Sequence, residues 1–467
     1  MSLEDLKKNW TENYKTVPES LGNVKKIKTA ATAFNANVDA VIKISGKKLL
    51  EYINEYKISF AELTNIKNFR LDEPRDVIKG IFRCFSKGIG EEWISEDIKV
   101  YDWMVENIGY DRIQMGGQGG IVANILAVAG IERVYAHTNS LPKLQAKQFL
   151  HLKNLLSFNE KGEEAPAYEI DRTTDIPLIH WIIEFDIGDS LELEGKVIAC
   201  PKSNRFIATY DPLNLNLIKD EPFVKKLIET PMDFIVLSGF HALIEGNNGL
   251  KLVEETVPAI KKWKNKSRDG ILHLEIASTQ DKVVRKAIVD RIAAIVDSIG
   301  VNERETIDIL EVIGQEKLAR ECEKNAHSVN LFKGVMEIKK YTKCPRIQMH
   351  IFGLYLTVQN KDFKVSAEAN LRGMELAAVV AASKAGTGHV NEEKNLLWAY
   401  GREVSDIGLS ELSDLAQYIG DDNILKSGIS EYDGFDIIAV PTILIEKPKT
   451  LVGMGDTISS VSLIGTI

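Results

Sequence analysis

The sequence predicts an α/β fold with a central, mostly parallel sheet and helices on both of its faces. Short apolar runs, which suit strands, recur through the second half of the chain at residues 234–240, 271–278, 293–302, 346–356 and 435–445. Helical patterns such as ERETIDILEVIGQEKLARECEKN lie between most of these runs. Apolar strands that alternate with helices are typical of parallel sheets buried on both faces. Ligands of such sheets bind at the carboxyl ends of the strands.

The composition is that of a globular protein, with 467 residues, 44% of them hydrophobic and 27% charged. This length predicts two or three domains, or one large domain with an insertion. A net charge of −9 argues against a nucleic-acid partner, although it leaves room for a local basic pocket that binds a small phosphate ligand.

Targeting and redox signals are absent from the sequence. The amino terminus, MSLEDLKKNWTENYK, lacks an apolar signal core. No apolar run reaches the roughly 18 residues of a membrane helix. The four cysteines, Cys84, Cys200, Cys322 and Cys344, form no CxxC pair, so we expect reduced core thiols and no zinc site. We therefore expect a soluble, cytoplasmic protein without a membrane partner.

Two stretches differ from the α/β pattern. Residues 179–211 resemble consecutive strands with little helix, and EFDIGDSLELEGK within them has the turn signals of a hairpin. Residues 41–112 mix helices with short extended pieces. We predict that 41–112 and 179–211 form a smaller, β-rich lid domain. The large domain would then comprise residues 1–40, 113–178 and 212–467.

The segment VGMGDTISS precedes the last predicted helix. Gly453 and Gly455 allow the backbone to come close to a ligand, and a helix amino terminus attracts anionic oxygens. Asp456 would face such an anion, which is unfavourable unless the carboxylate has a task. The obvious task is to take a proton from a hydroxyl that attacks phosphorus. The alternative is that Asp456 is only the N-cap of the helix.

Two segments in the first third of the chain suit polar ligands. MGGQGGIVANILAVAG places four glycines before an apolar helix; their amides could bind a hydroxyl or phosphate, but a flexible turn before a core helix is slightly favoured. In AFNANVDAV, Asn35, Asn37 and Asp39 alternate. They would share one face of an extended segment and bind a polyol, or they would form an Asx-rich turn.

Three further motifs have both a functional and a structural interpretation. In HLE, Glu275 could belong to the water shell of Mg²⁺, or His273 and Glu275 could form a buried, internally satisfied pair. In NERE, a capping box that joins Asn302 and Glu305 is favoured. Arg205, in KSNRFIATYD, could reach a phosphate with its guanidinium fork, although a solvated arginine is commoner.

Together and in this order, NANVD, MGGQGGIVAN, IHWIIEF, NRFIA, HLE, NERE and VGMGDTISS resemble the ADP-dependent sugar kinases, chiefly of archaea, within the ribokinase-like superfamily. The resemblance spans nearly the whole chain, and IAVPTILIEKPKTLVGMGDTISS is particularly specific. It implies a ribokinase-like large domain and ADP as the phosphoryl donor. The family comprises glucokinases, 6-phosphofructokinases and bifunctional members.

The resemblance also implies catalytic roles for matching positions of this chain. Asp456 would be the general base that deprotonates the 6-hydroxyl of the sugar. The N–H groups of Gly453, Met454 and Gly455 would form an anion hole for the transferred phosphoryl group. Arg205 would contact phosphate during transfer.

Ligand-binding roles follow in the same way. Mg²⁺, or another divalent cation, would be held largely through waters by Glu275, Glu305 and Asn302. Sugar hydroxyls would be bound by Asn37, Asp39 and the backbone at Gly116 and Gly117. The adenine pocket would be lined by His350 and Val440.

Two local differences favour glucose over fructose 6-phosphate as the acceptor. SKGIGEEWI places Glu92, with Glu91 as the alternative, at the position of a glucokinase Glu that binds a glucose hydroxyl, and a carboxylate there would repel a sugar phosphate. In LIHWIIEF, His180 would contact glucose. Leu178, His180 and Trp181 stand where phosphofructokinases of the family supply Lys and Arg.

The resemblance thus implies transfer of the β-phosphoryl group of ADP to glucose, giving AMP and glucose 6-phosphate in glycolysis. His241, in SGFHAL, departs from the Gln usual in glucokinases. The alternatives are a bifunctional glucokinase and 6-phosphofructokinase or, less favoured, a non-catalytic sugar- or nucleotide-binding regulator. We expect a monomer or a small homo-oligomer.

Overall fold

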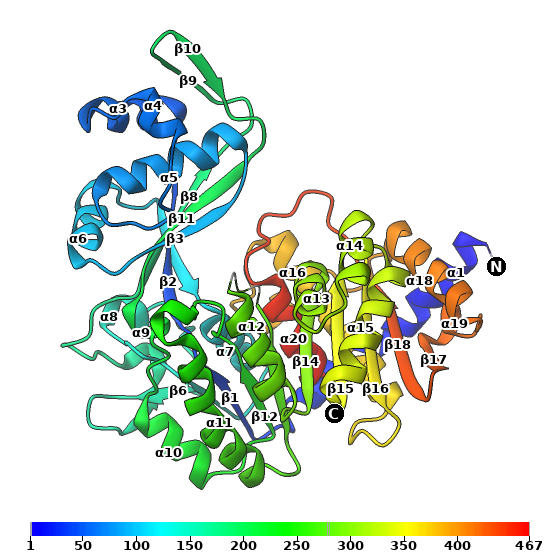
Figure 1. The fold of residues 1–467 in the computed structure, drawn as a ribbon. Helices are drawn as coiled ribbons and strands as arrows, with labels where there is room; N and C mark the ends of the chain where they lie inside the picture. Colours follow the sequence, from blue (N-terminus) through cyan, green and yellow to red (C-terminus); the bar gives the residue numbers. More distant parts are fainter. Residues whose placement is uncertain (1, 278, 280, 467) are drawn as a thin grey trace.

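The computed structural model describes residues 2–277, 279 and 281–466. Ser278, the last residue of one predicted apolar run, lies outside the described residues, as does Gln280. Met1 and Ile467, the first and last residues of the predicted large domain, also lie outside them. The chain forms an eleven-stranded sheet, a separate five-stranded sheet and a two-stranded hairpin (Figure 1). None of the helices in the described ranges is long and apolar enough to cross a membrane.

The eleven-stranded sheet is parallel in its middle and antiparallel at both edges. The seven adjacent strands from β6 to β15 are parallel to their neighbours. Strands β7, β16, β18 and β17 join antiparallel. In sheet order the strands are β17 (Ile429–Tyr432), β18 (Phe435–Pro441), β16 (Leu354–Asn360), β15 (Arg346–Ile351), β14 (Ser298–Asn302), β13 (Ile271–Glu275), β12 (Phe234–Leu237), β1 (Thr29–Ala33), β5 (Arg133–Ala136), β6 (Leu155–Phe158) and β7 (Glu164–Pro166).

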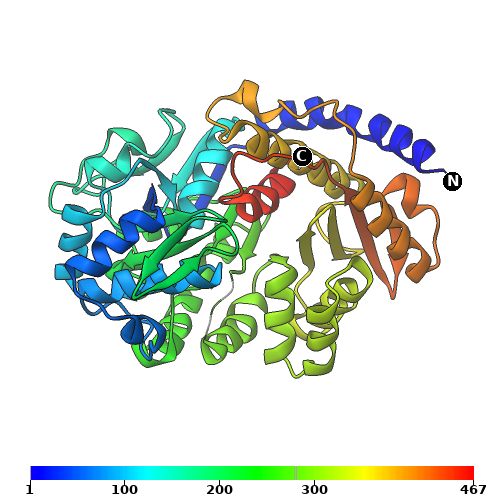
Figure 2. The same ribbon diagram turned by 90° about the horizontal axis from the view of Figure 1, so that it is seen from above.

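Helices cover both faces of this sheet, which confirms the predicted α/β class. Figure 2 shows the tan and red helices on one side of the sheet and the green to yellow-green helices on the other. The first group includes α16 (Ala367–Thr387) and α20 (Met454–Ile464), which pack on each other and on α2 (Val17–Val24) and α7 (Gln118–Val128). The second group includes α11 (Gly249–Lys266), α13 (Glu303–Val312) and α15 (Ser328–Thr342).

Two of the predicted apolar runs are not single strands. The run 346–356 turns back at Gly353, whose φ of 94° suits glycine, so it forms the β15–β16 hairpin. The run 293–302 begins as the end of a helical turn, Ile288–Ala293, and becomes a strand only at Ser298. Because a buried helix end and a buried strand are equally apolar, composition alone did not separate them.

The five-stranded sheet is formed, in order, by β3 (Glu91–Ser95), β11 (Asn204–Tyr210), β8 (Ile179–Phe185), β2 (Asn37–Lys43) and β4 (Arg112–Gly116). The predicted hairpin is confirmed as β9 (Ser190–Leu193) and β10 (Lys196–Ala199). Its two turn residues, Glu194 and Gly195, have φ values of 52° and 73°, as two-residue hairpin turns require.

This smaller sheet has its own hydrophobic core. Trp93, Trp181 and Phe206 are buried there with side chains of α5 (Pro74–Lys87) and other helices. The small sheet extends beyond the predicted lid limits of 41 and 112: strand β2 begins at Asn37, before the first limit, and strand β4 ends at Gly116, after the second. The division into a large domain and a lid stays a proposal, which the two separate cores support.

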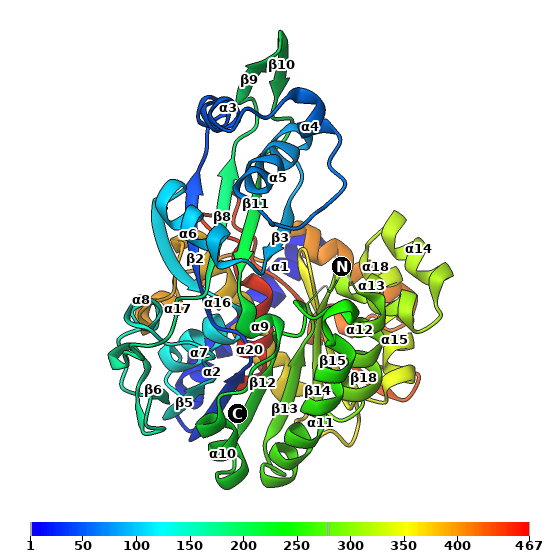
Figure 3. The same ribbon diagram turned by 60° about the vertical axis from the view of Figure 1, so that its left-hand side comes forward.

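The smaller sheet stands over the carboxyl ends of the large sheet's strands. Strand β2 follows β1 after three residues, and Figure 3 shows β2, β8 and β11 rising above α20. The fold therefore brings one face of the small sheet to the edge where ligands of α/β sheets bind.

Candidate active site

A cavity of about 250 Å³, here called the central cavity, lies between the small sheet and the start of α20. Successive side chains of a strand point to opposite faces. On β8, Trp181 and Ile183 therefore enter the core, whereas His180 and Ile182 line the cavity. The predicted residues on its wall are Asn35, Asn37, Asp39, Glu92, Gly117, His180, Arg205, Gly453 and Asp456.

Asp456 is not the N-cap of α20. That place belongs to Gly453, with φ 61° and ψ 30°, and Asp456 is the third helical residue. Its Oδ1 accepts a hydrogen bond from Gln118 Nε2 at 3.0 Å. Burial raises the pKa of Asp456, while the Gln118 bond and the Lys384 charge oppose this effect. A buried carboxylate thus faces the central cavity without serving as the cap.

The first turn of α20 can bind an anion. The amides of Met454 and Gly455 open the helix and so have no intrahelical acceptor. A Cβ added at Gly455 would come within 2.9 Å of His350 Nε2, so glycine is needed for this close approach. Burial lowers the pKa of His350 to about 4, which makes it a neutral neighbour. Val440, the second predicted adenine residue, is fully buried on β18 and is not among the residues that line the central cavity.

The HLE and NERE motifs place two carboxylates, those of Glu275 and Glu305, near Asp456. Glu275 Oε2 lies 3.1 Å from His273 Nε2, so the two residues do form a buried pair. The capping box is confirmed, because Asn302 N donates to Glu305 Oε2 at 2.8 Å and Glu305 N donates to Asn302 Oδ1 at 2.9 Å.

These carboxylates repel one another. The pKa of Glu305 is raised to about 8 and that of Glu275 well above its usual range, in both cases mainly by burial and partly by the charge of Asp456. A divalent cation fits this buried negative charge. In the described part of the chain, no group of three or more His, Cys, Asp or Glu is placed to hold an ion directly. The contacts that the family resemblance implies run largely through water.

The polyol motif and the glycine turn meet at one end of the cavity. Asn37 Nδ2 donates to Asp39 Oδ1 at 2.9 Å, and a Cβ added at Gly116 would come within 2.1 Å of that oxygen. Asn35 lies before β2, also lines the cavity, and accepts hydrogen bonds from the amides of Gly119 and Gly120. Part of the glycine turn is therefore occupied in starting α7.

Glu92 and His180 continue the same wall, because His180 of β8 is in register with Asp39 of β2. Thr209 Oγ1 donates to Glu92 Oε1 at 2.7 Å, and His180 Nε2 lies 3.0 Å from Asp211 Oδ2. Burial lowers the pKa of His180, but the Asp211 bond and nearby carboxylates raise it to about 9. Glu91, the alternative to Glu92, instead accepts a bond from Arg83 Nε at 2.9 Å. Leu178 and Trp181 are buried away from the cavity.

Sequence reasoning missed several residues of this site. Gln118 stands inside the glycine motif, where its amide had no distinguishing signal. Lys384 lies in the small, apolar stretch AAVVAASKAG, and a lone charge in such a buried helix was a usable signal. Arg205, predicted to contact phosphate, lines the cavity with an exposed side chain.

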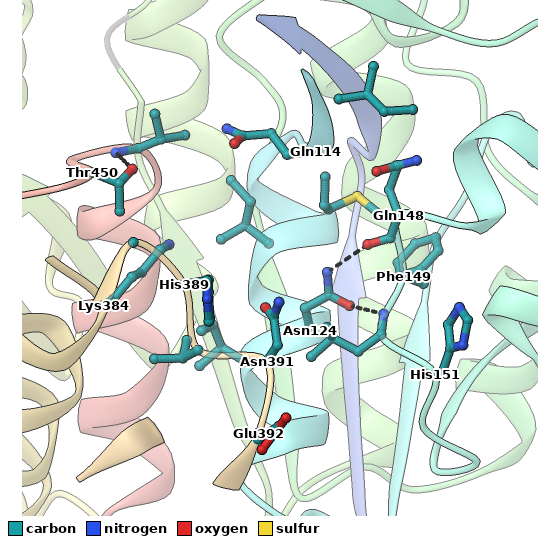
Figure 4. Close-up of a pocket in the computed structure, with 18 of the residues that line it drawn as sticks. Gln114, Asn124, Gln148, Phe149, His151, Lys384, His389, Asn391, Glu392 and Thr450 are labelled. Carbon is teal, nitrogen blue, oxygen red and sulfur yellow. Dashed lines mark hydrogen bonds between the residues drawn. The ribbon is translucent and has the colours of Figure 1, made fainter. Parts of the chain in front are cut away.

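A second cavity, of about 510 Å³, lies beside the central one and shares Gln114, Ile121 and Val452 with it. Figure 4 shows Lys384 and Thr450 on one side of this cavity and Asn124 and Phe149 on the other.

Comparison with known proteins gives a consistent picture. Residues 28–465 match a family model described as the ADP-specific phosphofructokinase/glucokinase conserved region. An ADP-specific phosphofructokinase of Methanosarcina acetivorans is 27% identical over 447 residues, which cover 92% of this chain and 91% of that protein. An ADP-dependent glucose/glucosamine kinase of Pyrococcus furiosus is 30% identical over 473 residues, which cover 98% of each chain.

Solved structures of similar proteins cover the whole chain. The last common ancestor of ADP-dependent phosphofructokinases from Methanosarcinales matches with a TM-score of 0.86 at 30% identity, covering 100% of this chain and 99% of that chain. An ADP-dependent kinase in complex with fructose 6-phosphate and ADPbetaS matches with a TM-score of 0.83 at 28% identity, covering 100% and 98%.

Proposed function

We propose that the acceptor of this protein is glucose. The chain belongs to the ADP-specific phosphofructokinase/glucokinase family and is therefore an ADP-dependent sugar kinase. The β-phosphoryl group of ADP moves to the 6-hydroxyl, giving AMP and glucose 6-phosphate. Relatives named for either sugar match at similar identity. The support for glucose therefore comes from the residues of the site.

The position of Glu92 in the cavity wall carries this proposal. Its carboxylate lies at the same end as His180, which is paired with Asp211. Carboxylates accept hydrogen bonds from sugar hydroxyls. They repel a sugar phosphate, since like unit charges 4 Å apart near a protein surface cost about 4 kcal/mol.

The reaction follows from the groups around the start of α20. Asp456 takes the proton of the 6-hydroxyl as that oxygen bonds to the β-phosphorus. The bond from this phosphorus to the bridging oxygen breaks, and AMP leaves with the oxygen. The amides at Gly453, Met454 and Gly455 hold the developing negative charge. Arg205, from the small sheet, reaches the same phosphoryl group.

A divalent cation, Mg²⁺ by preference of its oxygen ligands, would be held mainly through waters by Glu275, Glu305 and Asn302. When bound, it neutralises charge on the transferred phosphoryl group. The fold itself holds two of these side chains in place, because the capping box fixes Glu305 and His273 contacts Glu275.

The test compares Glu92→Gln with its neighbour Glu91→Gln. We expect Glu92→Gln to lower kcat/KM for glucose about 10- to 100-fold, because a hydrogen bond to a charged group contributes about 1.5–3 kcal/mol, and to leave or raise activity on fructose 6-phosphate. Glu91→Gln alters only contacts outside the cavity, with Arg83 and with Trp93 Nε1, and should retain wild-type selectivity. Equal selectivity in all three proteins would refute this assignment.

A bifunctional glucokinase and 6-phosphofructokinase is the second candidate. Arg112 and Arg205 line the same cavity, and an arginine can bind a sugar phosphate with two parallel hydrogen bonds. Comparable kcat/KM values for glucose and fructose 6-phosphate would favour it.

A further inference from the structure

Lys384 lies behind the first turn of α20, on the side of the second cavity. It comes from the last part of α16, and only 9% of its surface is exposed. Its ammonium group donates hydrogen bonds to Gly453 O and to Thr457 Oγ1, both at 3.0 Å. Burying a lysine charge is unfavourable unless the charge is paired, so the position of Lys384 needs an explanation.

The Gly453 carbonyl oxygen accepts three hydrogen bonds. It accepts from Thr457 N at 3.1 Å, from Thr457 Oγ1 at 2.7 Å and from Lys384. Space around this glycine is also closed, since an added Cβ would lie 3.1 Å from Lys384 Nζ and 2.9 Å from Ile121. Lys384 therefore fixes the residue from which the proposed anion hole begins.

Several charged or titratable groups face Asp456 from different elements. Glu275 of β13 and Glu305 of α13 place negative charge near it, and each has its own pKa raised by Asp456. His241 follows β12, and burial lowers its pKa. Lys384 of α16 places positive charge near Asp456.

We propose that Lys384 is a positioning residue for phosphoryl transfer, which holds the turn Gly453–Asp456 and with it the Asp456 carboxylate. Lys384 touches neither substrate nor reacting atoms and acts only through Gly453, Thr457 and Asp456. The proposal rests on the proposed role of Asp456 but not on the identity of the sugar.

The charge of Lys384 supports this role near neutral pH. Burial lowers the pKa of Lys384 to about 8, while the charge of Asp456 opposes the change. The ammonium form therefore predominates at pH 7, where both hydrogen bonds and the attraction to Asp456 are present.

The test uses Lys384→Met and a matched control, Lys339→Met. Lys339 is also buried, on α15, and donates to Cys344 O at 2.6 Å and to Asn360. AMP formation from ADP is measured with whichever of glucose and fructose 6-phosphate the wild type uses. Loss of the sugar assignment thus leaves this test intact.

We expect Lys384→Met to lower kcat about 10- to 100-fold, since a misplacement of about 1 Å costs up to 10²-fold, while KM for the sugar changes less than threefold. The acidic limb of the kcat/KM profile should move to higher pH by about one unit, because an opposite charge that lowered the pKa of Asp456 is lost. Lys339→Met should lower thermal stability but retain the kcat and the pH profile.

Folded Lys384→Met with kcat within twofold of wild type and an unchanged pH profile would overturn the proposal. An equal loss of kcat in Lys339→Met would also overturn it, since the effect would then be general. If Lys384→Met does not fold, Thr457→Val takes its place, because it removes one of the two acceptors of Lys384. We expect a three- to tenfold loss of kcat, and wild-type kcat in this variant would refute the role of Lys384.

Discussion

Substituting Gly116 by alanine tests the sugar end of the central cavity. The added Cβ would lie 2.1 Å from Asp39 Oδ1 and 2.4 Å from Asn37 Nδ2. Ordinary contact begins near 3.4 Å, so the carboxylate must retreat by more than 1 Å. This movement breaks the 2.9 Å bond between Asn37 and Asp39 and removes the carboxylate from the proposed sugar hydroxyl.

The expected loss follows from one hydrogen bond to a charged group, about 1.5–3 kcal/mol. With a factor of ten for each 1.4 kcal/mol, kcat/KM for the sugar should fall about 10- to 150-fold, mainly through KM. The KM for ADP should stay within twofold, because the adenine pocket is proposed to lie beside His350 and Val440, which do not line the central cavity.

Initial rates of AMP formation at varied glucose and varied ADP measure both constants. Gly22→Ala is the matched control, because a Cβ added at that exposed helical position meets no atom within 4 Å. Folded Gly116→Ala with wild-type kcat/KM for the sugar would refute the assignment of Asn37 and Asp39 to sugar binding. A large rise in the KM for ADP alone would place the nucleotide at this end.

Three further predictions concern catalysis and pH. Asp456→Asn should keep its glucose affinity in calorimetry but lower turnover by roughly 10²–10⁴, as loss of a general base does; near-normal turnover would remove that role. The pKa of His180 is raised to about 9, so its ion pair with Asp211 stabilises the fold fully below about pH 6.5 and is lost as the pH rises through 9. The Tm difference between wild type and His180→Gln should therefore shrink from pH 7 to pH 10. A constant difference would contradict this. Burial raises the pKa of Glu375 to about 8, so the stability of the fold falls as the pH rises from about 4.5 to 8. Glu375→Gln can still accept a hydrogen bond from the Thr16 hydroxyl, and it should raise Tm at pH 8.5 but not at pH 5. An equal shift of Tm at both pH values would count against a protonated Glu375 carboxyl.

Local sequence signals predicted local structure well. The spacing of Asn302 and Glu305 predicted a capping box, and the turn signals of EFDIGDSLELEGK predicted a hairpin, because each depends on a few neighbouring residues. The alternation of Asn37 and Asp39 correctly placed both on one face of a strand. Asn35 also lines the central cavity, although it precedes the strand.

Contacts between distant segments were not predictable in the same way. Gln118, Lys384 and Asp456 are separated by more than 70 residues in sequence, and only the packing of α7 and α16 against α20 brings them together. The choice between Glu91 and Glu92 likewise needed the strand's register, which turns one side chain toward Arg83 and the other toward the cavity.

The most direct test of the account is AMP formation from ADP and Mg²⁺ with glucose or fructose 6-phosphate as acceptor, each beside an arm with ATP. We predict glucose-dependent AMP release that ATP does not replace. AMP release with fructose 6-phosphate alone would contradict the assignment of Glu92 and His180 while leaving the chemistry of Asp456 in place. Phosphorylation with ATP alone would contradict the central claim, that the β-phosphoryl group of ADP is transferred at the start of α20.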